Sequence, residues 1–178
     1  LVGNTNRDQK VYNVIAEMLV LEHKLKTDKT TEWAATRIGT HDIECEQESC
    51  EVKSTVKRYG ADIVISGQHQ LQHVKRLYLY FCRMEESLEG VSINEMKDRL
   101  INCGYDEGKL ELEIERQGFE KGSHIREKKY KLLEKRKYEV DESFPQITQV
   151  SFKEEKYPDA ITHIQYTIDL DGISYTSW

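Results

Sequence analysis

The sequence predicts an α/β protein in which a mixed β-sheet is flanked by helices and followed by an α+β C-terminal extension. Three stretches indicate this fold: a helical stripe of apolar residues within 7–25, a hairpin over 40–55, and strand-rich segments after residue 131. Helices and strands are told apart by their periods, about 3.6 and 2 residues. We expect residues 1–90 to form the core from a helix, a hairpin, a strand and a second helix. Residues 91–178 then add a helical insertion and strands that complete or cover the same domain.

Composition limits the class of protein. The 178 residues (20.9 kDa) are enough for one domain with a substantial core. Charged residues make up 33% of the chain and its mean hydropathy is -0.71. No run approaches the roughly 18 apolar residues of a membrane span, and no signal peptide is visible. We therefore expect a cytoplasmic protein without a membrane partner. Because the chain begins at Leu1 rather than Met, we also expect it to be a piece of a longer one.

The first element is a helix from about Arg7 to Leu25. Glu17 lies near the edge of its apolar stripe, and Glu22 is a competitor for any functional role on this helix, although a solvated helix surface explains Glu22 equally well. Apolar residues recur here at helical spacing. They are Val11, Val14, Ile15, Met18, Leu19, Leu21 and Leu25.

The hairpin comes next, with a tight turn expected at Gln47 and Glu48. This turn pairs Cys45 with Cys50 and sorts the side chains of the two strands onto two faces. The apolar face contains Ile43, Cys45, Cys50 and Val52. None of the four cysteines of the chain has zinc-site spacing. Cys45 and Cys50 face each other and can form a disulfide, but without a secretory signal we expect two reduced, buried thiols.

The other face of the hairpin is charged and consists of Asp42, Glu44, Glu51 and Lys53. Three carboxylates at such a place repel one another, and a divalent cation that prefers oxygen ligands would relieve the repulsion. A solvated strand surface is the alternative, because Asp, Glu and Lys are the residues least often buried. Alternation along the strand directs the ring of His41 to the opposite face from Asp42.

The remaining elements follow from local signals. We expect a third strand of the core at Ile63 to Ile65 and a turn at Ser66 and Gly67. A helix follows, with Gln68 and His69 in its first turn and its main part from about Gln70 to Glu86. A capping box of Ser92 and Glu95 begins another helix, which Gly104 ends. We favour helix over strand at 109–114. Later strands are expected at 138–140, 147–152 and 161–170.

The pattern of Asp42 followed by Glu51-Val52-Lys53 resembles the PD-(D/E)XK nuclease superfamily. His41 stands where the Pro that names the superfamily would be, a change that removes no ligand. The run Glu51 to Thr55, the hydrophobic strand after it and the pair Gln70-Leu71 are similar to a bacterial family called PD-(D/E)XK motif proteins. Segments 143–148 and 160–173 also resemble the C-terminal part of that family.

This resemblance implies a restriction-endonuclease-like fold, with residues 1–90 as nuclease core, and a metal-dependent DNA endonuclease of restriction or phage defence. Asp42, Glu51 and Glu17 would hold Mg²⁺, with Mn²⁺ as a substitute, and Glu17 would bind directly or through water. Lys53 would stand beside the attacked phosphate, and Gln70 would steady Lys53 or the attacking water. Glu44 either adds a ligand or faces solvent, and we favour solvent. The expected partners are DNA and either a second copy of the chain, as a homodimer, or subunits of a defence complex.

The charge distribution suggests where DNA would lie. A net charge of -6 argues against a protein that coats nucleic acid, but local basic groups exist. We expect phosphate contacts from Lys57 and Arg58 after the hairpin, and from Lys75 and Arg76 on the helix that follows. The basic run 121–137 is either a further phosphate contact or a solvated, ion-paired surface.

Two other classes of function are open on the sequence alone. The chain can be a catalytically silent DNA-binding or assembly subunit, because a fold does not establish an activity. It can also be an interaction module whose hairpin binds no metal.

Overall fold

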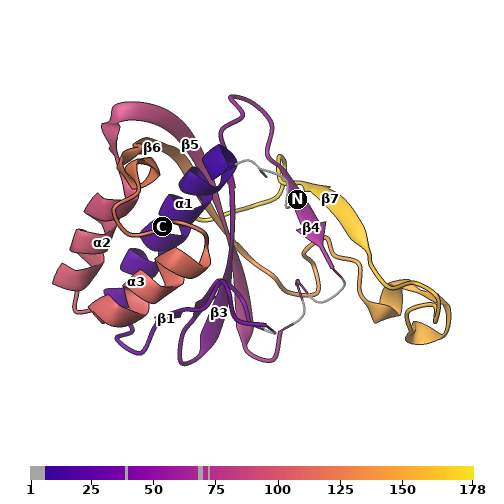
Figure 1. Cartoon of the computed structure of the whole chain (residues 1–178). Coiled ribbons are helices and arrows are strands. Elements are labelled where there is room, and N and C mark those ends of the chain that lie inside the picture. The colour runs from indigo at the N-terminus through magenta and orange to yellow at the C-terminus, as the bar shows by residue number, and fades with distance from the viewer. Residues whose placement is uncertain (1–6, 39, 68–69, 72) are drawn as a thin grey trace.

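The computed structural model describes residues 7–38, 40–67, 70–71 and 73–178 (Figure 1). Its helices are α1 (Arg7–Leu25), α2 (Ile93–Asn102) and α3 (Glu107–Arg116), and single 3-10 turns lie at His124–Glu127, Gln149–Ser151 and Lys153–Glu155. Its strands are β1 (Glu32–Trp33), β2 (Ile43–Glu44), β3 (Glu48–Thr55), β4 (Asp62–Ser66), β5 (Arg76–Val91), β6 (Tyr130–Glu139) and β7 (Gln165–Asp169). None of the helices in the described ranges has the length and hydrophobicity that crossing a membrane requires.

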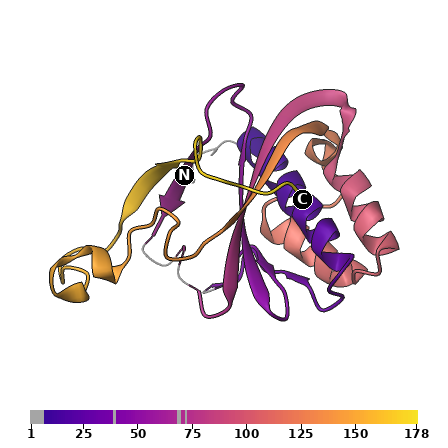
Figure 2. The same cartoon turned by 180° about the vertical axis from the view of Figure 1, so that it is seen from behind.

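Five strands form the main sheet in the order β1-β2-β3-β5-β6, and β4 pairs with β7 in a separate small sheet. In the main sheet β3 runs parallel to β5 and antiparallel to β2, so the sheet is mixed. Helices α1, α2 and α3 lie on one side of this sheet, and the small sheet lies on the other (Figures 1 and 2). The expected α/β fold with a mixed sheet flanked by helices, typical of restriction endonucleases, is confirmed.

The hairpin exists, but its predicted register was wrong by two residues. Cys50 pairs with Ile43, and Glu44 pairs with Ser49, so Cys45 lies opposite Glu48. A shift of two residues keeps every side chain on its face, because side chains alternate with a period of 2. The apolar face therefore still packs into the core, and the shift brings Asp42 opposite Glu51.

The predicted helix from Gln70 to Glu86 was wrong, since most of it is the long strand β5. Residues on one side of β5 enter the cluster beneath α1, among them Tyr80 and Met84, while Leu79 and Phe81 enter the cluster between the sheets. A strand buried on both faces is apolar throughout, and its run can also match a helical spacing. Gln68 and His69, expected at the start of this helix, lie outside the described residues.

Helix α1 positions the core. Its stripe, including Val14, Ile15, Met18 and Leu21, is almost completely buried against the apolar face of β3 and β5. Burying a Leu, Ile or Met side chain stabilises a fold by about 1.5–3 kcal/mol, so this packing dominates the placement of the helix. The predicted helix 7–25 is thus confirmed.

Helices α2 and α3 also agree with their signals. The Ser92 hydroxyl accepts the N–H of Glu95, and the Glu95 carboxylate accepts the N–H of Ser92, which completes the capping box. Gly104 follows with φ of +92°, a conformation that glycine adopts without a steric cost. In α3 the buried residues Leu110 and Ile114 are one helical turn apart, which confirms helix rather than strand at 109–114.

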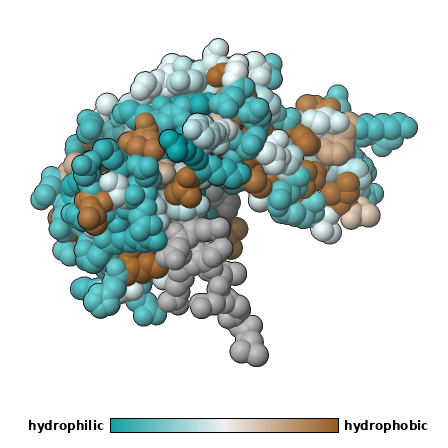
Figure 3. All heavy atoms as spheres, turned by 90° about the horizontal axis from the view of Figure 1, so that it is seen from above, coloured by the Kyte–Doolittle hydropathy of each residue, from teal (hydrophilic) through white to brown (hydrophobic). Residues whose placement is uncertain are grey.

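The C-terminal part both extends the main sheet and adds the small one. Strand β6 pairs with β5, and β7 pairs with β4. We had expected β4 to belong to the core sheet, but it lies in the small sheet instead. The strand expected at 147–152 was wrong, because this stretch contains the 3-10 turn Gln149–Ser151. The segment with the 3-10 turns Gln149–Ser151 and Lys153–Glu155 projects from the body as an arm, and hydrophobic surface is exposed on it (Figure 3). Val150 in this arm is 73% exposed.

Candidate metal and active site

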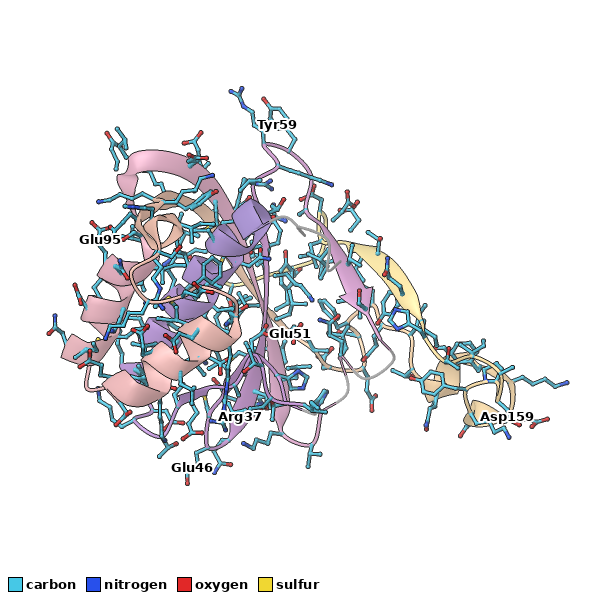
Figure 4. The ribbon with its side chains drawn as sticks, in the orientation of Figure 1. Arg37, Glu46, Glu51, Tyr59, Glu95 and Asp159 are labelled. Carbon is cyan, nitrogen blue, oxygen red and sulfur yellow. The ribbon has the colours of Figure 1, made fainter. Side chains whose placement is uncertain are left out.

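Two cavities meet at Asp42, Glu51 and Gln70. The larger, about 1290 Å³, lies between the β2–β3 hairpin, residues 66–67, 70–71 and 73–75, and the base of the arm. The smaller, about 390 Å³, extends along β3 past Lys53 towards Thr55 and β4. Asp42, Glu51 and Gln70 line both cavities, and Figure 4 shows Glu51 between the main and small sheets. A substrate that spans the two cavities would therefore pass over these three side chains.

Glu51 is the centre of the site. It is only 5% exposed, and Lys53 forms an ion pair with it at 3.0 Å. The ring of His41 contacts its other oxygen, with 3.4 Å between Nδ1 and Oε2. Burial by itself would raise the pKa of Glu51, but the hydrogen bond from His41 and the charge of Lys53 outweigh it and lower the pKa. Glu51 is consequently held as an anion.

Asp42 is positioned by the backbone of β3. Strand β2 pairs with β3 only as far as Cys50, and beyond it the Asp42 carboxylate accepts the N–H of Val52 at 2.7 Å. Val52 stands between Glu51 and Lys53 in the sequence, so one hydrogen bond fixes Asp42 relative to both. Burial, then the charges of Glu51 and Glu17, raise the pKa of Asp42 well above its ordinary value.

Glu17 reaches the site from α1. The indole N–H of Trp33 donates to its Oε2 at 2.8 Å, and the side-chain amide of Gln117 donates to the same oxygen at 3.1 Å. Burial raises the pKa of Glu17 to about 7, with a smaller contribution from the charge of Glu51. Its competitor Glu22 instead pairs with Arg99 of α2 at 2.5 Å, a contact between two helices.

Gln70 lies in a turn, not on a helix as predicted. Its Oε1 accepts the N–H of Ser66 at 2.7 Å, and its Nε2 donates to Glu51 at 2.5 Å. The backbone donor at Ser66 fixes the orientation of the amide, because only its oxygen can accept there. Gln70 therefore connects the end of β4 to the carboxylate of Glu51 rather than contacting Lys53 first.

Three residues near the carboxylates were not identified from the sequence. Trp33 and Gln117 hold Glu17, and they come from β1 and the end of α3, distant in the chain. His41 was expected to turn away, but it precedes β2 and has no strand alternation to obey, so its ring reaches Glu51. Only His41 had a sequence signal, its position next to Asp42.

The donor set fits a divalent cation. Three carboxylates interact electrostatically within a partly buried site, and Lys53 is the ammonium group that pairs with one of them. Carboxylate oxygens are the ligands that Mg²⁺ and Mn²⁺ prefer. The ligand oxygens of Glu17, Asp42 and Glu51 are not all within 4.8 Å of one another in the described structure.

A different group of potential ligands, Cys45, Glu48 and Cys50, is drawn together on the opposite face of the hairpin. Both thiols are free and buried, as predicted. Glu48 forms an ion pair with Lys24, whose ammonium group repels a further cation. The hydrogen bond from Cys50 lowers the pKa of Cys45 to about 7. This group is separate from the carboxylate site, because neighbouring strand residues point to opposite faces.

Glu44 and the four predicted DNA contacts occupy different parts of the surface. Glu44 accepts hydrogen bonds from Ser49 and from the backbone of His41, so it caps the hairpin rather than joining Asp42. Lys75 contacts Glu44 at 3.4 Å and Arg76 contacts Glu139 at 3.3 Å. The prediction that these two residues lie on a helix was wrong, because Arg76 begins β5 and Lys75 directly precedes it.

Lys57 and Arg58 follow the other end of β3, about 23 Å from Arg76 along the strand. The four cations thus form two groups and not one patch. In the basic run 121–137 most cations are paired with carboxylates, which favours the ion-paired surface over a phosphate contact. These pairs are Arg126 with Glu111, Lys128 with Glu86, Lys129 with Glu95, Lys131 with Glu89, and Arg136 with Glu134.

Comparison with known proteins identifies the family of the chain. Residues 13–171 match the family described as "Putative PD-(D/E)XK family member, (DUF4420)". No match was found among curated proteins or among solved structures. The matched range includes Glu17, Asp42, Glu51, Lys53 and Gln70, and it covers most of the chain. The chain belongs to this family of the PD-(D/E)XK superfamily.

Proposed function

We propose that this protein hydrolyses phosphodiester bonds of DNA with the help of a divalent cation, Mg²⁺ or Mn²⁺. The observation that carries the proposal is the placement of Asp42, Glu51 and Lys53. Asp42 is bonded to the backbone between the other two, and Glu51 and Lys53 are 3.0 Å apart. Membership of the PD-(D/E)XK superfamily supports a nuclease-like function. DNA as the substrate, and a setting in restriction or phage defence, rest on the resemblance of the motifs.

Asp42 and Glu51 would hold the cation, and Glu17 would bind it directly or through water. Such a cation, when bound, stabilises negative charge on a phosphate and lowers the pKa of a coordinated water. The charges of Glu51 and Glu17 raise the pKa of Asp42, which indicates that the three carboxylates repel one another. A bound cation would remove this repulsion, and this favours its binding.

Lys53 would act on the phosphate itself. Its ammonium group is fixed by Glu51 and lines the smaller cavity, where it can orient a water and donate to a nonbridging oxygen. A cation placed where charge develops is worth more in a water-poor site than in bulk solvent. Gln70 would position Glu51, because it donates to the same oxygen, Oε1, that Lys53 contacts.

One observation favours the alternative of a catalytically silent DNA-binding or assembly subunit. Glu51 already receives three contacts, from His41, Lys53 and Gln70, so the site is electrostatically satisfied in part without an ion. In that case the fold would be kept for assembly as a homodimer or with other subunits of a defence complex.

Plasmid cleavage distinguishes the two. The parent protein and the variants Asp42→Asn and Lys53→Met are incubated with supercoiled DNA and Mg²⁺ or Mn²⁺. Glu44→Gln is the matched control, because Glu44 is a nearby carboxylate that caps the hairpin and is not a proposed ligand. We expect the parent and the control to cut DNA, and each site variant to be slower by about 100-fold or more. Equal cleavage by all four would overturn the assignment. DNA binding by the parent without any cleavage would establish the silent alternative.

A further inference from the structure

The loop 56–60, which joins β3 to β4, is exposed and yet firmly braced. Arg83 of β5 is only 8% exposed, and its guanidinium donates to the backbone oxygens of Lys57 at 2.5 Å and Gly60 at 2.9 Å. Glu134 neutralises this buried guanidinium at 2.8 Å. Gly60 has φ of +75°, which closes the turn at a conformation that side chains disfavour. A partly buried ion pair therefore holds the loop in one shape.

What the braced loop presents to solvent is unusual. Tyr59 is 76% exposed and Val56 is 49% exposed, although both have apolar surface to bury. The guanidinium of Arg58 lies 5.6 Å from the centre of the Tyr59 ring, within the range of a cation–π contact. Figure 4 shows Tyr59 at the outer end of the molecule, on the loop beyond β3.

The two basic side chains of this loop, Lys57 and Arg58, are also available to contact a ligand. Neither Lys57 nor Arg58 has an ion pair within the described ranges, whereas Lys75 and Arg76 at the other end of β3 are both paired. Two cations that form no ion pair among the described residues thus directly precede an exposed aromatic ring on a rigid support. This combination is what binds a nucleic-acid strand without a sequence code, through stacking on bases and attraction of phosphates.

The loop is continuous with the candidate active site. The smaller cavity is lined by Glu51, Lys53 and Thr55 of β3 and by Asp62 of β4, the strands on either side of the loop. Along β3, Thr55 lies about 13 Å from Glu51, a span of about four steps of B-form DNA at 3.4 Å each. Lys53 is two residues before Thr55, about 7 Å along the strand, so a strand of DNA with its phosphate at Lys53 would meet the loop two or more nucleotides away.

We propose that the loop 56–60 is a nucleobase-binding element, in which Tyr59 stacks on a base while Lys57 and Arg58 contact the flanking phosphates. This inference rests on the proposed DNA nuclease function and extends it to how the substrate is held. The occupant is a base that is unstacked or at the end of a strand, because only such a base offers its face to a side chain.

The test uses an introduced fluorophore. The native Trp33 and Trp178 are buried or half-buried, so Tyr59→Trp adds an indole at an exposed position. With Ca²⁺ in place of Mg²⁺, single-stranded DNA should quench the new emission, and a strand of the same length without bases should not. Leu112→Trp on the exposed side of α3 is the control, and its added emission should not change.

Affinity and cleavage complete the test. Tyr59→Ala should weaken binding of single-stranded DNA by about 5- to 150-fold, while Tyr59→Phe should bind like the parent. Cleavage by Tyr59→Ala should show a raised KM with kcat unchanged. If parent and Tyr59→Ala bind equally and the parent cleaves DNA, the loop has no such role and the nuclease proposal stands. If the parent neither binds nor cleaves DNA, both proposals fall.

Discussion

The indole N–H of Trp33 donates to the carboxylate of Glu17 at 2.8 Å, which ties strand β1 to the middle of α1. The bond restricts the rotation of a buried carboxylate that would otherwise be free to turn away from Asp42 and Glu51. Both described hydrogen bonds of Glu17 end on Oε2, one from Trp33 and one from Gln117. Within the described residues, Oε1 therefore has no donor and is available to a cation or its water.

Trp33→Phe tests whether Trp33 positions Glu17. It removes the hydrogen bond but keeps an aromatic ring, and loss of a group that orients a ligand typically costs 10- to 100-fold in metal affinity. We expect Mn²⁺ binding to weaken by about tenfold in calorimetric titration. The midpoint of its pH dependence should also rise, because the bond from Trp33 lowers the pKa of Glu17. An unchanged midpoint would assign Trp33 a purely structural role.

The pH dependence of Mn²⁺ binding follows from Glu17. A cation competes with the proton on this carboxylate, whose pKa is raised from 4.5 to about 7 by burial. Affinity should therefore increase as the pH rises through 7. Without metal, the sign for stability is the reverse. The folded state holds the proton more tightly, so stability from this group is complete below pH 4.5 and is lost as the pH rises through about 7. Glu17→Gln should remove the contribution of Glu17 from both profiles and leave that of Asp42, whose pKa is also raised, as followed by titration calorimetry and by urea unfolding.

Gln70→Ala tests the bridge between β4 and Glu51. The substitution removes the donor to Glu51 and the acceptor of the Ser66 N–H in one step. We expect plasmid cleavage to fall by about 10- to 100-fold, the range for loss of a group that orients a ligand. Gln146→Ala, at the base of the arm on the same large cavity, is the control and should cleave like the parent. Normal cleavage by Gln70→Ala would remove Gln70 from the machinery.

Acid stability should depend on Glu111. The side-chain hydrogen bonds from Arg126 and Lys97 lower the pKa of Glu111 to about 2. A lowered pKa contributes stability above 4.5, and that stability is lost as the pH falls towards 2. Glu111→Gln should destabilise the protein at pH 7 by about 3–5 kcal/mol, since Arg126 is buried and loses its partner. Urea unfolding at pH 7 and pH 3 checks this, with the exposed Glu115→Gln as control. A loss below about 1 kcal/mol at pH 7, the size expected for a surface ion pair, would contradict the prediction.

Local signals predicted much of the fold. The stripe of α1, the capping box of α2 and the alternation of the hairpin are each contained in a few neighbouring residues, and each agrees with the structure. Strand β5 was missed because its partners decide its conformation. Its apolar run is long enough for a helix, and only burial between α1 and the small sheet makes it a strand.

The candidate site also contains a part that the sequence predicts and a part that depends on tertiary packing. Asp42, Glu51 and Lys53 are adjacent along one hairpin, so their pattern predicted a shared place. The contacts of Glu17 with Trp33 and Gln117 span 16 and 100 residues of sequence and depend on how α1, β1 and α3 pack. The two-residue shift of the hairpin had no effect on the faces, but it decides that Asp42 is bonded next to Glu51. No signal in 40–55 distinguishes the two registers.

The most direct test of the central claim is a crystal structure of the protein soaked with Mn²⁺, in which anomalous scattering locates the ion. We predict a peak coordinated by oxygens of both Asp42 and Glu51, with Glu17 bound directly or through water, and no such peak in crystals of Glu51→Gln. A protein that binds Mn²⁺ only at Cys45, Glu48 and Cys50, or nowhere, would contradict the account.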